Sequence, residues 1–197
     1  NDRYGLTQAV IEGRKTMTRR LVPWALTEQW MEFVSDAPSV GGVYVHESEK
    51  EFYEREAPRY KVGEVVAVAQ SYRDVCAGGF EPDATILRLF EEQRIAGWTN
   101  KMFTKAELMP YQIRITGIKC ERLQDISDED CFREGISESW YESTDTTTYG
   151  YADEKKGTAV EFDTPRKAFA TLIDKVSGKG TWARNPWVVV YEFELVK

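Results

Sequence analysis

The chain has 197 residues, of which 42% are hydrophobic and 13% aromatic, and its formal net charge is −7. This composition can furnish a packed core and excludes global disorder, and the length suits a single domain over residues 1–197. The acidic balance argues against a protein that binds duplex nucleic acid through a broad basic face, and it leaves room for a local basic cleft. No apolar run approaches the roughly 20 residues that span a bilayer, so no membrane contact is expected.

Cysteine and histidine usage argues against a metal site. Cys76, Cys120 and Cys131 are scattered without a CxxC pair, and His46 is the single histidine. Zinc needs four converging ligands of this kind, so we expect no metal. The odd number of cysteines fits a reducing cytoplasm, and no GxGxxG or Walker A motif indicates a nucleotide cofactor.

Four short elements are predicted in the first third of the chain. They are a helix over Leu6–Glu12, an extended segment over Lys15–Val22, a helix over Thr27–Val34 and a strand over Val43–His46. Thr7 can cap the first helix, and Gly13 suits the left-handed position that ends it.

The remaining elements are clearer. Strands are predicted over Val65–Tyr72, Gln112–Leu123 and Trp187–Leu195, and helices from Ser127 to Gly135 and over Pro165–Val176. Gly117 marks a bulge in the second of these strands. Loops are expected over 76–83 and 178–185, residues 84–95 are ambiguous between helix and strand, and the polar segment 141–161 is expected to be an exposed insertion.

Strands outnumber helices and do not alternate with them regularly. This order favours an α+β fold around a mainly antiparallel, partly closed sheet over a doubly wound parallel sheet.

The stretch "IEGRKTMTRRLVPW" gathers cations in an otherwise acidic chain. Lys15 and Thr18 could form a base and nucleophile pair, because a threonine hydroxyl reacts only when a base takes its proton. In a regular strand, however, residues 15 and 18 face opposite sides, so such a pair needs a turn or bulge between them. The alternative is that Lys15 and its arginine neighbours form a solvated edge.

Four segments in this order resemble the ASCH domain, a relative of the PUA domain, and are most similar to ASCH-like proteins of phages and prophages. They read "AVIEGRKTMTRR", "YKVGEVVAV", "IKCERLQDISDEDCFREGI" and "NPWVVVYEFELV". The resemblance covers about half of the chain, with insertions near 25–58, 76–99 and 141–161. It implies a PUA-like, mainly antiparallel β-barrel flanked by helices, with a cleft for RNA or a modified nucleoside.

One branch of that family hydrolyses N4-acetylcytidine with a lysine, a threonine and a glutamate. Carried over by motif, these positions are Lys15, Thr18 and Glu134. The resemblance therefore implies either a binding module for RNA or a nucleoside, in a basic cleft that includes Arg14, Lys15, Arg19 and Glu134, or an amidohydrolase. A third alternative is a phage accessory protein that binds another protein.

Aromatic and basic residues supply further ligand candidates. Trp98 lies among polar residues and could stack on a base, and Lys101 beside it could contact phosphate. Arg14 and Arg19 are candidates for anion contacts. Trp24, Tyr72 and Trp187 could also stack on a base, but we expect them to belong to the core.

Overall fold

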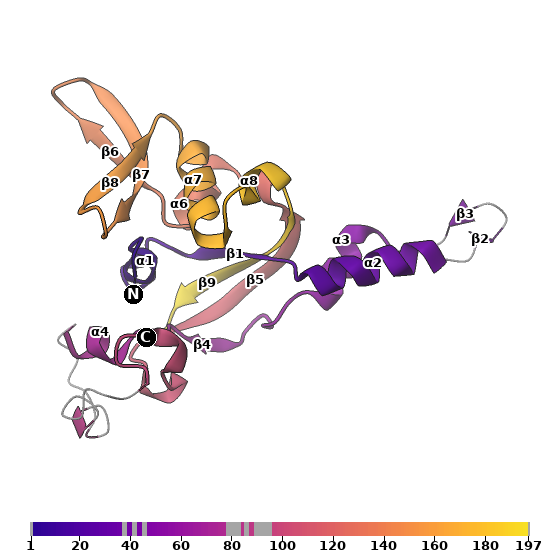
Figure 1. Ribbon diagram of the computed structural model, residues 1–197, viewed down its shortest axis with the longest axis horizontal. Helices are drawn as coiled ribbons and strands as arrows, with labels where there is room; N and C mark the ends of the chain where they lie inside the picture. The colour runs from indigo at the N-terminus through magenta and orange to yellow at the C-terminus, as the bar shows by residue number, and fades with distance from the viewer. Residues whose placement is uncertain are drawn as a thin grey trace.

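The computed structural model describes residues 2–36, 39–40, 43–44, 47–77, 84, 87–88 and 96–196. Its centre is a four-stranded sheet in the order β1 (Met17–Leu21), β9 (Trp187–Leu195), β5 (Gln112–Arg122) and β4 (Val65–Ala67). Every neighbouring pair in this sheet is antiparallel. The sheet curls into a half-barrel flanked by helices, which confirms the α+β antiparallel prediction (Figure 1).

The alternating apolar residues of β9 divide the core into two layers. Val188 and Val190 face one cluster, which α6 (Asp128–Arg133) and α7 (Pro165–Ser177) cover. Val189, Tyr191 and Phe193 face the other cluster, which α3 (Glu49–Glu56) covers. Since successive side chains of a strand point to opposite faces, β9 contributes to both layers at once.

The bulge predicted in β5 is present. Ile115 pairs with Phe193 and Gly117 with Glu192, so the register shifts between these positions. A Cβ on Gly117 would lie 3.4 Å from the Glu192 side chain. The extra residue increases the local twist and helps the sheet to curl.

The first helix, α1 (Leu6–Ile11), confirms the predicted element but not its cap. Gly5, with φ of 65°, occupies the N-cap position, so Thr7 already lies inside the helix. The carboxylate of Asp2 instead accepts hydrogen bonds from the backbone N–H groups of Thr7 and Gln8, each at 2.9 Å. At the other end, Gly13 has the expected left-handed conformation.

A helical arm extends away from the sheet (Figure 1). It contains α2 (Trp24–Asp36) and α3, with the two-residue strands β2 (Ser39–Val40) and β3 (Val43–Tyr44) between them. The predicted helix over Thr27–Val34 lies within α2, while α3 was not predicted. The strand predicted over Val43–His46 is present at Val43–Tyr44, and His46 lies outside the described residues.

The strand predicted over Val65–Tyr72 was too long. It ends as β4 at Ala67, and Tyr72 begins α4 (Tyr72–Ala77). The hydroxyl of Ser71 accepts a hydrogen bond from the Asp74 N–H, which favours a helix start at this point over continued pairing. Two 3-10 turns, η1 (Lys101–Phe103) and η2 (Ala106–Leu108), follow before β5.

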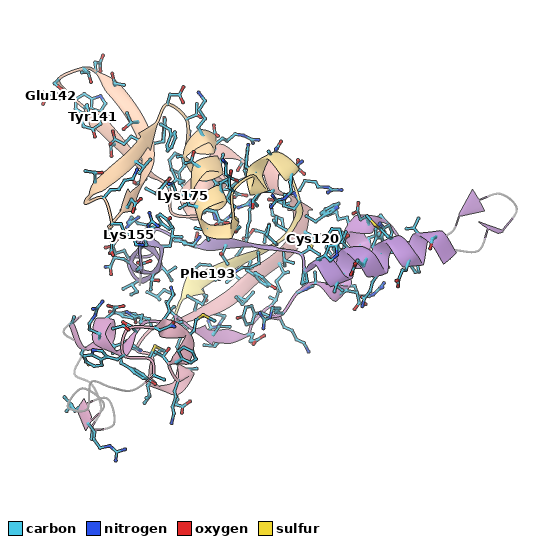
Figure 2. The ribbon with its side chains drawn as sticks, in the orientation of Figure 1. Cys120, Tyr141, Glu142, Lys155, Lys175 and Phe193 are labelled. Carbon is cyan, nitrogen blue, oxygen red and sulfur yellow. The ribbon has the colours of Figure 1, made fainter. Side chains whose placement is uncertain are left out.

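The segment expected to be an exposed insertion forms most of a second sheet. Its strands are β6 (Ser137–Tyr141), β7 (Thr146–Asp153) and β8 (Thr158–Phe162). Tyr141 and Glu142 lie at its outer end (Figure 2). Tyr151 packs into the first core cluster, so the inner end of this sheet belongs to the globular body.

The elements near the C-terminus follow the sequence closely. Leu123–Asp125 forms η3, and Ser127 caps α6 by accepting a hydrogen bond from the Asp130 N–H. Pro165 opens α7 as expected. The predicted loop over 178–185 contains a short helix, α8 (Thr181–Arg184).

Candidate functional site

Two of the three residues carried over from the family motif lie in direct contact. Lys15 precedes β1, and Glu134 caps the C-terminal end of α6. The Lys15 Nζ lies 2.6 Å from Glu134 Oε2, 2.8 Å from the Glu134 carbonyl oxygen and 2.7 Å from the Met17 carbonyl oxygen. Both side chains are buried, so this ion pair is shielded from solvent.

The hydrogen bonds around Lys15 fit its charged form. Three acceptors surround Nζ, and an ammonium has three N–H groups to donate, whereas a neutral amine has two. Burial lowers the pKa of Lys15, and the Glu134 carboxylate opposes that shift. Burial is the larger effect, so the pKa of Lys15 lies below its usual value, while the three acceptors around Nζ favour the charged form.

Arg19 extends this contact into an ion-pair cluster of buried Lys15, Arg19 and Glu134 with half-buried Glu121 and Asp130. Its guanidinium, fully buried, lies 2.6 Å from Glu121, 2.7 Å from Asp130 and 3.2 Å from Glu134. Burial opposes the charge of Arg19, but the three carboxylates outweigh it and raise the pKa of the guanidinium. Both cations of the cluster, Lys15 and Arg19, are therefore paired with carboxylates of the same cluster.

Thr18 lies on the other face of β1. It pairs with Tyr191, whose side chain belongs to the second core cluster, whereas Met17 belongs to the first. Side chains of directly opposed residues share a face, so Thr18 points away from the face that carries Met17 and Arg19. Among the described residues, no hydrogen bond joins the Thr18 hydroxyl to Lys15 or Glu134.

The remaining predicted ligand residues are dispersed. Arg14 is exposed and forms an ion pair with Glu12 at 2.6 Å. Trp98 is half-buried against the small core of Tyr72, Val75 and Met109. Lys101 is also half-buried, and its Nζ lies 3.3 Å from the Thr7 hydroxyl on α1.

The other aromatic candidates divide between core and surface. Tyr72 is buried, and its hydroxyl accepts a hydrogen bond from the Lys105 N–H at 3.0 Å. Trp187 packs against the second core cluster, and the Arg122 guanidinium lies 4.6 Å from its ring centre. Trp24, in contrast, is 68% exposed at the start of α2, so the prediction that it lies in the core was wrong.

A cavity of about 210 Å³ lies beside α1, and no sequence pattern had indicated it. It is lined by Gln8, Ile11, Gln70, Asp74, Val75, Pro110 and Tyr111. This volume is several times that of one water, about 30 Å³, and below the roughly 300 Å³ of pockets for drug-sized ligands. A space of this size can admit a group as large as one aromatic ring.

Gln70 is the unusual member of the cavity wall. The residue is only 9% exposed, and its Oε1 has no hydrogen-bond partner among the described residues. Leaving a buried acceptor unpaired costs about 1–3 kcal/mol, so the position is unfavourable for folding alone. A water molecule or a ligand that donates a hydrogen bond to this oxygen would remove that cost.

The described residues form neither a metal-binding group nor a membrane span. No cluster of three histidine, cysteine, aspartate or glutamate side chains with metal-binding geometry occurs among them. Cys76, Cys120 and Cys131 are free thiols. Within the same ranges, no helix has the length and apolar character needed to cross a bilayer.

We compared the chain with protein-family models, with curated proteins and with solved structures. No family model, curated protein or solved structure matches this chain. The resemblance to ASCH domains accordingly remains an expectation from the sequence motifs.

Proposed function

We propose that this chain binds RNA or a modified nucleoside, and that a base enters the cavity beside α1. The observation that carries the proposal is the unpaired, buried Oε1 of Gln70, a residue in the wall of a cavity of about 210 Å³. Amide side chains are suited to base recognition because they donate and accept hydrogen bonds together. Tyr111 adds an aromatic ring to the same wall.

The basic cleft expected from the sequence is not the place where we propose that the ligand binds. Lys15 and Arg19 are already paired with the carboxylates of Glu121, Asp130 and Glu134, so the proposal places the base in the cavity and not among these residues. Lys101 is the candidate for phosphate, since it contacts Thr7 and the next residue, Gln8, lines the cavity. A single phosphate contact of this kind gives a modest salt dependence.

A calorimetric titration with single nucleosides and a short single-stranded RNA tests the proposal. Ile11→Trp should fill the cavity and abolish binding, because Ile11 lines it. Met31→Trp is the matched control, since Met31 is 61% exposed on the arm. Binding that survives Ile11→Trp unchanged, or tight binding to random duplex DNA that persists in high salt, would contradict the proposal.

The contact between Lys15 and Glu134 favours a second candidate, an amidohydrolase acting on N4-acetylcytidine or a related acylated nucleoside. In this mechanism Lys15 is the base, Thr18 the nucleophile and Glu134 the acid and base. Proton transfer requires hydrogen-bond reach, so Thr18 would have to approach Lys15 from the opposite face of β1. Neither Lys15 nor Glu134 lines the cavity, so variants can separate hydrolysis from binding.

Chromatography of N4-acetylcytidine after incubation with the protein tests the second candidate. Release of cytidine that is lost in Thr18→Ala and in Glu134→Gln would support the mechanism. Turnover at the wild-type rate by Thr18→Ala would remove threonine as the nucleophile. No turnover across a panel of acylated nucleosides would leave the binding function alone.

A further inference from the structure

We infer that the cavity selects bases that carry an exocyclic amino group, with Gln70 and Asp74 as the acceptors. This inference rests on the proposed nucleoside binding and adds the class of base. Both residues line the cavity and lie four positions apart, Gln70 just before α4 and Asp74 in its first turn. They supply acceptors from one short segment of the chain.

Gln70 supplies the first acceptor. Its backbone N–H donates to the Met109 Sδ at 3.4 Å, which holds the residue against the small core. Its Oε1 is turned into the wall without a donor among the described residues. The terminal torsion of glutamine is soft, so a rotation can present this oxygen to the cavity, where a donor on the ligand would satisfy it.

Asp74 supplies the second acceptor. Its side chain is 42% exposed, and the Arg73 Nε lies 3.9 Å from its carboxylate, at the limit of an ion pair. A carboxylate only accepts hydrogen bonds, so it cannot satisfy Gln70 Oε1. Gln70 Oε1 and the Asp74 carboxylate can therefore each accept a hydrogen bond from a donor on the ligand.

An exocyclic amino group meets this requirement because it carries two N–H donors on one nitrogen. Cytosine and adenine present such a group, whereas uracil and hypoxanthine present a carbonyl oxygen at the same place. That oxygen would face the Asp74 carboxylate, which cannot donate to it, and a bond to the Gln70 side-chain N–H would still leave Gln70 Oε1 unpaired. Sites built to bond a polar group discriminate strongly against analogues that lack it.

Two matched pairs of nucleosides test the selection by calorimetric titration of the full chain. Cytidine should bind about tenfold more tightly than uridine, and adenosine about tenfold more tightly than inosine. Equal affinities within both pairs would overturn the inference and leave the proposed function standing. Failure of all four nucleosides and of single-stranded RNA to bind would contradict the proposed function and this inference with it.

Substitutions in the wall provide the second test. Gln70→Met keeps the shape and removes the unpaired acceptor, so it should lose the tenfold preference without lowering the melting temperature. Gln124→Met is the matched control, because the Gln124 Nε2 already donates to the Trp182 carbonyl oxygen at 2.8 Å. This control should lower the melting temperature and keep the preference.

Asp74→Asn tests whether Asp74 contacts the base, because a purely structural role of Asp74 would not change which base is preferred. The amide replaces an acceptor by a group that can also donate, so uridine and inosine should gain affinity relative to cytidine and adenosine. Because Asp74 is partly exposed, the variant should fold normally. An unchanged preference in both Gln70→Met and Asp74→Asn would overturn the inference.

Discussion

Lys15 and Glu134 lie 119 positions apart in the chain and form a buried ion pair with 2.6 Å between Nζ and Oε2. The pair ties the segment between α1 and β1 to the end of α6. Gly135, with φ of 104°, follows directly, and a Cβ there would lie 3.2 Å from Leu6 on α1. The close approach of α1 and α6 thus depends on both the ion pair and a glycine.

Replacing Lys15 tests the contribution of this pair to folding. Lys15→Met leaves the Glu134 carboxylate buried with only Arg19 as a partner, so we expect unfolding to become easier by about 3 kcal/mol. Urea denaturation measures the change. Arg14→Met is the control, and it should change the free energy of unfolding by less than about 0.5 kcal/mol because its ion pair is exposed. Equal effects of the two substitutions would show that the buried pair does not stabilise the fold.

Asp174 gives the stability a dependence on pH. The backbone N–H groups of Trp182 and Gly180 donate to its carboxylate at 2.8 and 2.9 Å, and they lower the pKa of Asp174 in the folded chain. The folded pKa lies below the unfolded value, about 3.9, so this stabilisation is complete above that pH and is lost as the pH falls through the folded pKa. Asp174→Asn should therefore destabilise the chain most at neutral pH, and the difference from wild type should shrink below about pH 4. A difference that stays constant from pH 7 to pH 2 would rule out this linkage.

The three cysteines should react at different rates with a thiol reagent. Burial raises the pKa of Cys120 to about 11 and that of Cys131 to about 12, and neither side chain is exposed. Cys120 lies where β5 meets α3 (Figure 2). Half-buried Cys76 should react first in the native protein, and all three should react in denaturant. Rapid native labelling of Cys131 would contradict the packing of α6.

Gly150 should be intolerant of a side chain. A Cβ at this position would lie 2.3 Å from the Val160 carbonyl oxygen on the paired strand β8. We expect Gly150→Ala to destabilise the protein by about 1–3 kcal/mol in thermal or urea unfolding. Gly117→Ala is the control, since its Cβ would meet only the flexible Glu192 side chain at 3.4 Å. A larger loss in Gly117→Ala would reverse this expectation.

Local patterns in the sequence predicted the elements that bury an apolar face. The alternation in β5 and β9, the bulge at Gly117 and the spacing in α7 all correspond to the structure. The helix α3 was missed although Ser48 and Glu51 form a capping box, a signal that the sequence contains. The second sheet was missed because its polar strands bury few side chains.

The site was less predictable because it depends on contacts between distant segments. The period of two along β1 accounts for Thr18, which faces away from Met17 and Arg19, but Lys15 lies before the strand. The approach of Lys15 to Glu134 followed only from the family resemblance. The surroundings of Gln70 include Met109 and Tyr111, which lie far from it in the chain, and no local pattern encodes such contacts.

The most direct test of nucleoside binding in the cavity is an NMR titration of the ¹⁵N-labelled chain with cytidine and adenosine. We expect saturable shifts in the backbone and side-chain amide signals of Gln8, Ile11, Gln70, Asp74 and Tyr111, with the Gln70 side-chain amide among the largest. Signals of the arm, such as those of Trp24 and Met31, should stay unchanged. No shifts at the cavity residues, or shifts confined to the arm or to β6, would contradict nucleoside binding in this cavity.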